Sequence, residues 1–460
     1  MKRAIVVLAL LALTAIGAAL AYQTAARQRD HRAALTRGDN ALRDDQTFAA
    51  IEAYSGAIEL RPDSMLAYLR RGQTYRRRGD RGDLDAAARD FRAAAALDPT
   101  AIRPLEELGD IHYQLQRYAR AAEAYESGLR LDDRSARVSG KLALARYRNG
   151  DIDGALTAVD QALRLDDRMA DAQYLLGMCL REKARTTDAI RAFEKAVTLA
   201  PGMIAAREEL ADLYGTQGRR ADELEQLQVL AGLDPAHVER QIAYGMAHAR
   251  AGHWDLAVLT LGGALERNHD DPRIYRALGQ VWLERPRDDR TFLSKAHEAL
   301  ERVASSPSAT SDVLTLYGRA LQQEGDIENA ERTLQQATTR YPIEPTALLL
   351  YASVAEKQNH LDLARTALIQ YSGLVAEDAD FASRATRIAA LSLRLRDPAT
   401  AVSWLTQAAS ASPNDVRLLA ALADAQIRSG DRTAAQATIA RGIEKDPKNP
   451  QLLALARRAK

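Results

Sequence analysis

The sequence predicts an all-α protein made of helix pairs that repeat along the chain, and three observations predict this fold class. A frame of alanine, large apolar residue, small residue and proline occurs at Ala189, Phe193, Ala196 and Pro201 and returns many times. Eight of the eleven steps between successive proline positions are 34 residues long. A glycine recurs between the two halves of the unit, where one helix must end before the next begins. One hydrophobic helix is expected to precede the repeats.

The first element is a hydrophobic segment, Ala4 to Tyr22, with nineteen residues and no charge. As a helix rising about 1.5 Å per residue, it would come close to spanning the apolar core of a bilayer. Lys2 and Arg3 precede it, and Ala19-Leu20-Ala21 has the small-x-small pattern of a signal-peptidase site. Residues 1–30 are therefore predicted to be a hydrophobic segment and a link, and both a retained membrane anchor and a cleaved signal peptide stay open.

The basic residues around this segment bear on the orientation of the protein. Arg27, Arg29 and Arg32 follow the segment, so the excess of positive charge before it is almost balanced. A short basic leader is typical of export, and we therefore expect the repeats outside the cytoplasm. The sequence is also rich in alanine and arginine.

 The composition by itself is typical of bacterial proteins. The predicted location is therefore periplasmic or otherwise extracytoplasmic, with the repeats held at the membrane if the segment is retained and exported in soluble form if it is cleaved.

The second half of each unit carries the apolar frame. Residues at i, i+4 and i+7 lie on one face of a helix, so the frame predicts an apolar stripe that packs against a neighbour. The same frame starts at Ala50, Ala87, Ala330, Ala401 and Ala435. Where the proline is missing, the alanine twelve residues upstream of its position is still present, at Ala121, Ala155, Ala257, Ala296 and Ala364.

The first half of each unit carries a Gly or Ala, which lies 24 residues before the proline position in units without an insertion, as at Gly177, and 27 residues before it at Gly72 of the second unit. These small residues are expected to let the first helices approach their neighbours, while Tyr54 or Phe193 fills the space between helix pairs. Glycine just past a helix can adopt the left-handed conformation that ends it. The recurring turn glycines are Gly79, Gly150, Gly218, Gly252, Gly325 and Gly430.

This pattern resembles the tetratricopeptide repeat family, with its 34-residue unit, its L-G-x2-Y first helix and its A-x3-F second helix. The matching segments are ALGQVW (Ala277 to Trp282), ELADLY (Glu209 to Tyr214) and the frame that begins at Ala189. The resemblance implies a right-handed α-α superhelix, a solenoid of antiparallel helix pairs whose first helices line an inner groove.

The resemblance covers residues 31–447, and a terminal helix over 449–460 is expected to cover the last pair. The expected units, about twelve in number, have the approximate bounds 31–64, 65–101, 102–135, 136–169, 170–203, 204–237, 238–271, 272–310, 311–344, 345–378, 379–415 and 416–449. Three departures affect the unit boundaries: Glu223 replaces the frame alanine in the sixth unit, the tenth unit ends at Ala376, and the eighth has a five-residue insertion around Arg285 to Arg290.

Charge and motifs narrow the function. With 63 basic and 62 acidic residues, the net charge of +1 provides no long-range field for nucleic acid, so no nucleic-acid partner is expected. The sequence has no phosphate-binding loop, no nucleophile elbow and no His-Glu-x-x-His metal motif. The single cysteine, Cys179, is expected to be a buried thiol. We therefore expect no catalytic residues, no cofactor and no metal, and the repeats leave no length for a catalytic domain.

The candidate site is the groove face of the first helices in units two to five. Tyrosine, methionine and arginine combine apolar area with directed hydrogen bonds and favour extended or helical peptide ligands. The alternative is that each tyrosine simply packs between repeats. The candidate residues are Leu69, Gln73, Arg76, Asp110, Tyr113, Leu144, Tyr147, Arg148, Tyr174, Met178 and Arg181.

The sequence thus predicts a non-enzymatic scaffold or adaptor, tethered to or exported across the bacterial membrane. It would bind protein or peptide partners in its concave groove, in envelope assembly, secretion or polymer export. Two alternatives stay open: a self-assembling structural scaffold, and a subunit of an enzyme complex whose activity is not visible in the sequence.

Overall fold

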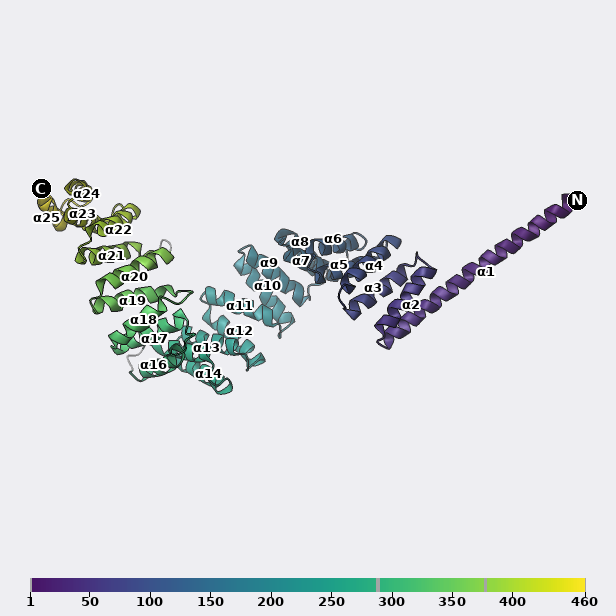
Figure 1. Cartoon of the computed structure of the whole chain (residues 1–460), viewed down its shortest axis with the longest axis horizontal. Coiled ribbons are helices and arrows are strands. Elements are labelled where there is room, and N and C mark those ends of the chain that lie inside the picture. The colour runs from purple at the N-terminus through teal and green to yellow at the C-terminus, as the bar shows by residue number, and fades with distance from the viewer. Residues whose placement is uncertain (1, 287–289, 376–378, 460) are drawn as a thin grey trace. The chain divides into compact units, whose positions relative to one another are not determined.

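A computed structural model describes the backbone of residues 2–286, 290–375 and 379–459, and their side chains except those of residues 2–12 and 290. All regular secondary structure in these residues is helical, so the all-α prediction is confirmed (Figure 1). The chain forms two compact units, Met1–Gln226 and Leu227–Lys460.

The helices of the first unit follow one another with short turns. They are α1 (Lys2–Arg43), α2 (Thr47–Leu60), α3 (Met65–Arg78), α4 (Asp83–Leu97), α5 (Ile102–Gln114), α6 (Tyr118–Leu129), α7 (Ala136–Arg148), α8 (Ile152–Leu165), α9 (Ala170–Glu182), α10 (Thr186–Leu199) and α11 (Ile204–Thr216). The boundary of the two units falls within α12 (Arg220–Leu233).

The second unit continues in the same manner. Its helices are α13 (Val238–Arg250), α14 (Trp254–Arg267), α15 (Pro272–Glu284), α16 (Arg290–Ala304), α17 (Ser311–Glu324), α18 (Ile327–Ala337), α19 (Pro345–Lys357), α20 (Leu361–Leu374), α21 (Phe381–Arg394), α22 (Pro398–Ala411), α23 (Val416–Ser429), α24 (Arg432–Lys445) and α25 (Pro450–Arg458).

The helices pack in sequence order within each unit. From α1 to α11, and again from α13 to α25, each helix contacts the next one. Several odd-numbered helices also contact the next odd-numbered helix, for example α7 with α9 and α15 with α17. These odd-numbered helices, which are the first helices of the pairs, therefore lie side by side.

α1 is one uninterrupted helix from Lys2 to Arg43, so the predicted link before residue 31 is helical and runs directly into the first pair. His31 and Ala34 are buried, whereas Leu13, Ile16 and Leu20 are more than half exposed. Within the described part of the chain, no helix is both long enough and apolar enough to span a bilayer. The side chains of residues 4–12, nearly half of the predicted hydrophobic segment, lie outside the described residues.

The turn inside each helix pair has a left-handed residue, except between α15 and α16, where residues 287–289 lie outside the described part of the chain. All the predicted turn glycines have a positive φ, from 71° at Gly218 to 90° at Gly325, which confirms their predicted role. Units without a glycine place another residue there that also has a positive φ, including Ala184 at 56° and Arg396 at 59°. The turn geometry is therefore common to these units, even where the residue type is unfavourable for it.

The predicted apolar frame is the core of each pair. Ala189, Phe193 and Ala196 are fully buried, and a Cβ atom added to Gly177 would lie 2.5 Å from the Phe193 ring. The structure thus identifies the neighbour that the small residue accommodates: the large side chain on the second helix of the same pair. The same contact joins Gly38 to Tyr54, at 2.4 Å from the added Cβ.

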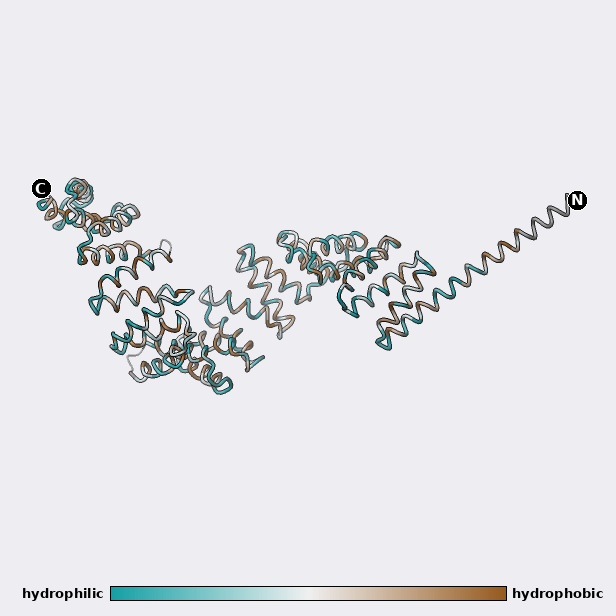
Figure 2. The backbone as a smooth tube through the Cα atoms, viewed as in Figure 1, coloured by the Kyte–Doolittle hydropathy of each residue, from teal (hydrophilic) through white to brown (hydrophobic). Residues whose placement is uncertain are grey.

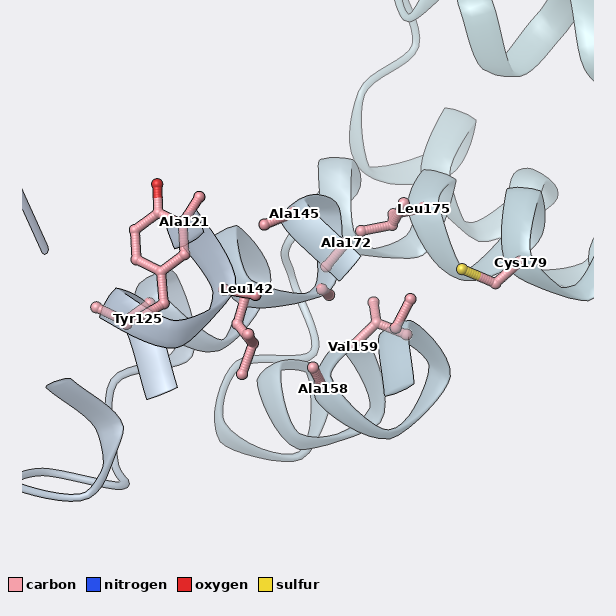
Figure 3. Packing of buried hydrophobic residues seen from close by; sticks show 13 residues of the cluster. Ala121, Tyr125, Leu142, Ala145, Ala158, Val159, Ala172, Leu175 and Cys179 are labelled. Carbon is pink, nitrogen blue, oxygen red and sulfur yellow. The ribbon is translucent and has the colours of Figure 1, made fainter. Parts of the chain in front are cut away.

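Burial is distributed along the chain. One apolar cluster joins side chains of α6, α7, α8 and α9, among them Tyr125, Leu142, Val159 and Leu175 (Figure 3). Similar clusters link successive helices elsewhere, and hydrophobic and hydrophilic stretches alternate along the helices (Figure 2). Each pair buries its apolar face mainly against the adjacent pairs, as expected for a repeat protein.

Of the three departures from the pattern, the described residues include Glu223 and part of the insertion around Arg285 to Arg290. Glu223 is only 3 % exposed, and Arg220 Nη1 donates to its Oε2 at 3.2 Å, so the position stays buried despite its charge. Ala376 and residues 287–289 of the predicted insertion lie outside the described residues. At the end of the chain, α25 buries Leu452 and Leu455 against the last pair.

Candidate protein-binding surface

The exposed side of the first helices α3, α5, α7, α9 and α11 is the surface on which the predicted site residues lie. We call it the first-helix face. Two kinds of side chain occupy it: charged residues that bridge neighbouring first helices, and a group of half-buried apolar and aromatic residues.

The bridge between α3 and α5 centres on Glu107. Gln73 Nε2 donates to Glu107 Oε1 at 2.7 Å, and Arg76 pairs with the other carboxylate oxygen. Glu107 is 9 % exposed, so both partners hold a nearly buried charge. Gln73 and Arg76, two predicted site residues, therefore support the stacking of the helices.

The bridge between α5 and α7 is larger. Lys141 Nζ lies 2.8 Å from Glu106 Oε1 and 2.7 Å from Asp110 Oδ2, and Arg137 Nη2 donates to Glu106 Oε2 at 2.7 Å. Asp110 also accepts a hydrogen bond from Tyr125 Oη at 2.7 Å. Asp110, a predicted site residue, is thus occupied by contacts inside the stack.

Leu69 is also part of the stack, because it is 5 % exposed and lies in the cluster around Phe91. Sequence periodicity places Leu69 on the groove side of its helix but cannot show how closely the next helix approaches. The structure therefore assigns Leu69 to the core, which corrects its assignment to an open groove surface.

The other predicted apolar residues form a group on consecutive first helices. We call this group the aromatic patch, and it consists of Tyr113, Leu144, Tyr147, Tyr174 and Met178. Leu144 is 36 % exposed and the others are half-buried. The inner edges of Tyr113, Tyr147, Tyr174 and Met178 pack on the clusters around α5 to α10, so the patch has a packed base and an accessible outer surface.

Ring contacts hold two of the tyrosines in place. The Tyr113 ring lies edge to face with Tyr118 at 5.3 Å between centroids, and the Tyr174 ring lies 5.7 Å from Phe193. The pKa of Tyr147 is raised mainly by burial and, to a smaller extent, by the nearby carboxylate of Glu182. The pKa of Tyr174 is likewise raised mainly by burial and, to a smaller extent, by the carboxylate of Glu209. Both hydroxyls therefore stay protonated at neutral pH and can donate hydrogen bonds.

The two remaining predicted residues are arginines at the edge of the patch. Arg181 pairs with Glu209 and so joins α9 to α11. Arg148 is exposed and contributes to the electrostatics of Tyr174. The structure therefore brings the second half of the predicted set together as a patch and uses most of the first half as bridges.

Sequence reasoning missed the partners of these bridges, chiefly Glu107, Lys141 and Glu209. A signal does exist in the sequence, because oppositely charged residues of successive first helices stand 28 to 35 residues apart, as in Arg181 with Glu209 and Glu106 with Lys141. That spacing is close to the period of the repeat. Because each ion pair joins two different helices, the pattern cannot be recognised from any one helix alone.

The side chains of this surface are suited to binding a partner. Cys179, beneath the patch, is fully buried, and burial raises the pKa of its thiol to about 11. Among the described side chains, no three His, Cys, Asp or Glu residues are grouped so that they could hold a metal ion. The first-helix face is therefore a partly apolar surface, packed on the core and with charged side chains at its edge.

Comparisons with known proteins agree with the repeat pattern. A family model described as tetratricopeptide repeat matches residues 35–102, 78–136, 141–204, 243–307 and 316–373, and a second model of the same description matches residues 392–459. The first model alone matches more than half of the chain.

Individual proteins match more distantly. Small glutamine-rich tetratricopeptide repeat-containing protein 2 of Mycosarcoma maydis is 31% identical over 109 residues, or 24% of this chain and 30% of that protein. This chain thus spans about a third of the length of that curated relative.

Two solved structures are among those that match this chain. PilF of Pseudomonas aeruginosa is 19% identical, with 47% of this chain and 97% of that chain covered and a TM-score of 0.39. YrrB, described as a TPR protein with an unusual peptide-binding site, is 21% identical, with 42% and 97% covered and a TM-score of 0.36.

Proposed function

We propose, from the premise that this chain belongs to the tetratricopeptide repeat family, that it is a membrane-tethered adaptor that binds segments of other proteins on its first-helix face. Membership of this family supports a protein-interaction scaffold. In the proposal, about twelve helix pairs form the array, α25 closes it, and the partners act in envelope assembly, secretion or polymer export.

The aromatic patch is the observation that carries the proposal. Its tyrosines and Met178 stay partly exposed although their inner edges pack on the core. Aromatic residues on a rigid base are the side chains that most often dominate binding energy, because they bury a large area and lose little conformational freedom. Apolar residues at steps of three and four along adjacent helices suit an extended or helical segment.

Co-purification from detergent-solubilised membranes tests the adaptor function. We expect wild-type protein to recover at least one partner, and Tyr147→Ala plus Tyr174→Ala to weaken its binding by about tenfold or more. Tyr341→Ala plus Leu259→Ala is the matched control, because these side chains are 95 % and 70 % exposed and lie on other helices and loops.

A second variant separates binding from folding. Leu144→Glu places a charge at the most exposed position of the patch and is expected to weaken binding with little change in the circular dichroism melt. Unchanged partner affinity in both patch variants would remove this surface as the site. Pure protein that turned over a substrate without any partner would defeat the adaptor function, and light scattering that grew with concentration would point to self-assembly.

The tether is the second part of the proposal. The pattern of Ala19 to Ala21 allows cleavage, but these residues lie inside uninterrupted α1, and proteases cut exposed loops more readily than helices. The exposed Leu13, Ile16 and Leu20 support an apolar environment around this part of α1. The repeats would lie outside the cytoplasm.

Mass measurement of the mature protein tests the tether. We expect a mass that includes the residues before Ala19, in the membrane fraction. A mature chain that began at Tyr22 would show cleavage instead. Protease added to cells without an outer membrane is expected to digest the repeats, and full protection would place them in the cytoplasm.

A further inference from the structure

We propose that the aromatic patch selects segments in which an apolar anchor is followed or preceded by lysine or arginine. This inference rests on the proposed function and specifies the partner of the same surface. It comes from the distribution of charge along the first-helix face, and from which of those charges are already paired.

The first helices alternate in charge at the start of the chain. α3 has five basic and no acidic residues, and α7 has four basic and no acidic residues. Between them, α5 has one basic and three acidic residues. After α7 the alternation ends, because α9 has two acidic residues against one basic residue and α11 has three against one.

The acidic residues of α5 are all paired. Glu106, Glu107 and Asp110 each contact a basic side chain of α3 or α7, as described above. Their negative charge is therefore largely neutralised within the stack, so it would attract a ligand only weakly. A partner that approached this part of the face would meet a compensated surface.

In the described part of the structure, the basic residues of α9 and α11 leave three carboxylates uncompensated: Asp171 in the first turn of α9, Glu182 and Asp212. Arg181 pairs with Glu209, while Arg207 donates to Gln226 Oε1 at 2.7 Å and to the backbone carbonyl of Pro201 at 2.8 Å. Glu182 and Asp212 are both exposed, and neither makes a hydrogen bond or an ion pair with any side chain in the described part of the structure.

Local helix chemistry gives no reason for Glu182. It is the last residue of α9, and a negative charge at a helix C-terminus is unfavourable for the helix dipole. Its carboxylate acts on Tyr147 and thus borders the patch, where it would attract a cationic group of a ligand. Asp212 lies one turn beyond Glu208, whose carboxylate acts on Tyr174.

Arg148 is the opposing charge at this edge. It is exposed and has no ion-pair partner among the described side chains, so one guanidinium stands against the two carboxylates of Glu182 and Asp212. The balance stays negative. A cationic side chain of a partner would gain from these carboxylates and from the faces of neutral tyrosines, whereas an acidic segment would be repelled.

Selection from a randomised twelve-residue peptide library against the full chain tests the inference. We expect the selected peptides to depend on Tyr147 and Tyr174 and to be enriched in Lys and Arg over Asp and Glu beside an apolar residue. For one such synthetic peptide, Glu182→Gln plus Asp212→Asn should weaken binding about fivefold at low salt, and less at high salt. Glu123→Gln, an exposed carboxylate on α6, is the matched control.

The outcomes separate this inference from the proposed function. Peptides that depend on the two tyrosines but show no excess of basic residues would overturn the charge selection and leave the binding surface intact. The same conclusion would follow if Glu182→Gln plus Asp212→Asn bound as tightly as wild type. A library that yielded no ligand dependent on the tyrosines would count against the proposed function itself.

Discussion

Ala184 occupies the left-handed turn position with a φ of 56°. This conformation costs a residue with a Cβ atom about 1–2 kcal/mol, and glycine avoids most of that cost. We expect Ala184→Gly to raise the free energy of unfolding by about 1 kcal/mol, measured by urea denaturation.

The matched substitution in a helix has the opposite sign. Ala390 is exposed in the interior of α21, where glycine costs about 0.5–1 kcal/mol relative to alanine. Ala390→Gly should therefore lower the unfolding midpoint. If both variants shifted the midpoint downward, the turn conformation at Ala184 would not be strained.

Cys179 has a chemical consequence at the same scale. Burial raises the pKa of its thiol to about 11, well above the value of about 8.5 for a free thiol. The thiolate is the reactive form, so we expect iodoacetamide at pH 8 to label the native protein about a hundred times more slowly than the urea-unfolded chain. Mass spectrometry of timed samples measures both rates, and equal rates would contradict the buried thiol.

The raised pKa of Cys179 also determines how the stability of the protein changes with pH. Because the folded pKa is above the unfolded pKa, the stability contribution is full below about pH 8.5 and declines as the pH rises from there towards 11. Cys179→Ala should remove this part of the alkaline decline.

The sequence predicts some of these residue positions and not others. Gly79 and Gly150 mark their turns because glycine is the residue that favours a positive φ. Ala184 and Arg396 carry no such mark, because the helices on either side impose the conformation on them. Only the period of the repeat indicates these turns.

At the scale of the helix pair, the closest contact is between a small residue and a large one. An added Cβ at Gly177 would lie 2.5 Å from the Phe193 ring, so Gly177→Ala should destabilise the protein by about 1–3 kcal/mol. Gly202→Ala is the control, because an added Cβ there meets nothing within 4 Å. Urea denaturation monitored by circular dichroism measures both.

The chain already contains the compensating pair. In α7 and α8 the same positions hold Ala143 and Val159, and both are fully buried. We expect Gly177→Ala plus Phe193→Val to be more stable than the sum of the single changes predicts, because the smaller side chain makes room for the methyl group. Strict additivity would show that the two positions do not touch.

At the scale of the helix, some features of the candidate site could be predicted from the sequence and others could not. The stripe of Ala189, Phe193 and Ala196 follows from one helix alone, and it is confirmed. The bridge from Lys141 to Glu106 and Asp110 depends on how two first helices are set against each other. That offset comes from packing across a whole pair, so it could not be read from either helix.

At the scale of the whole chain, coupling passes between adjacent pairs. Phe193→Ala leaves a cavity that typically costs about 3–5 kcal/mol. We expect hydrogen exchange to speed up first in α9, α10 and α11, whose side chains share its cluster, and to stay unchanged in α21 to α25. Uniform acceleration along the chain would show a single cooperative fold instead.

The common turn gives the chain a further property, which concerns its history. Because Gly150, Ala184 and Gly218 stand 34 residues apart and all have a positive φ, a duplication or deletion of one such length joins matching ends. Unequal recombination within the gene could thus add or remove one unit while the remaining helix pairs keep their register. The number of hairpins is then free to drift between lineages while the shape of each hairpin is inherited.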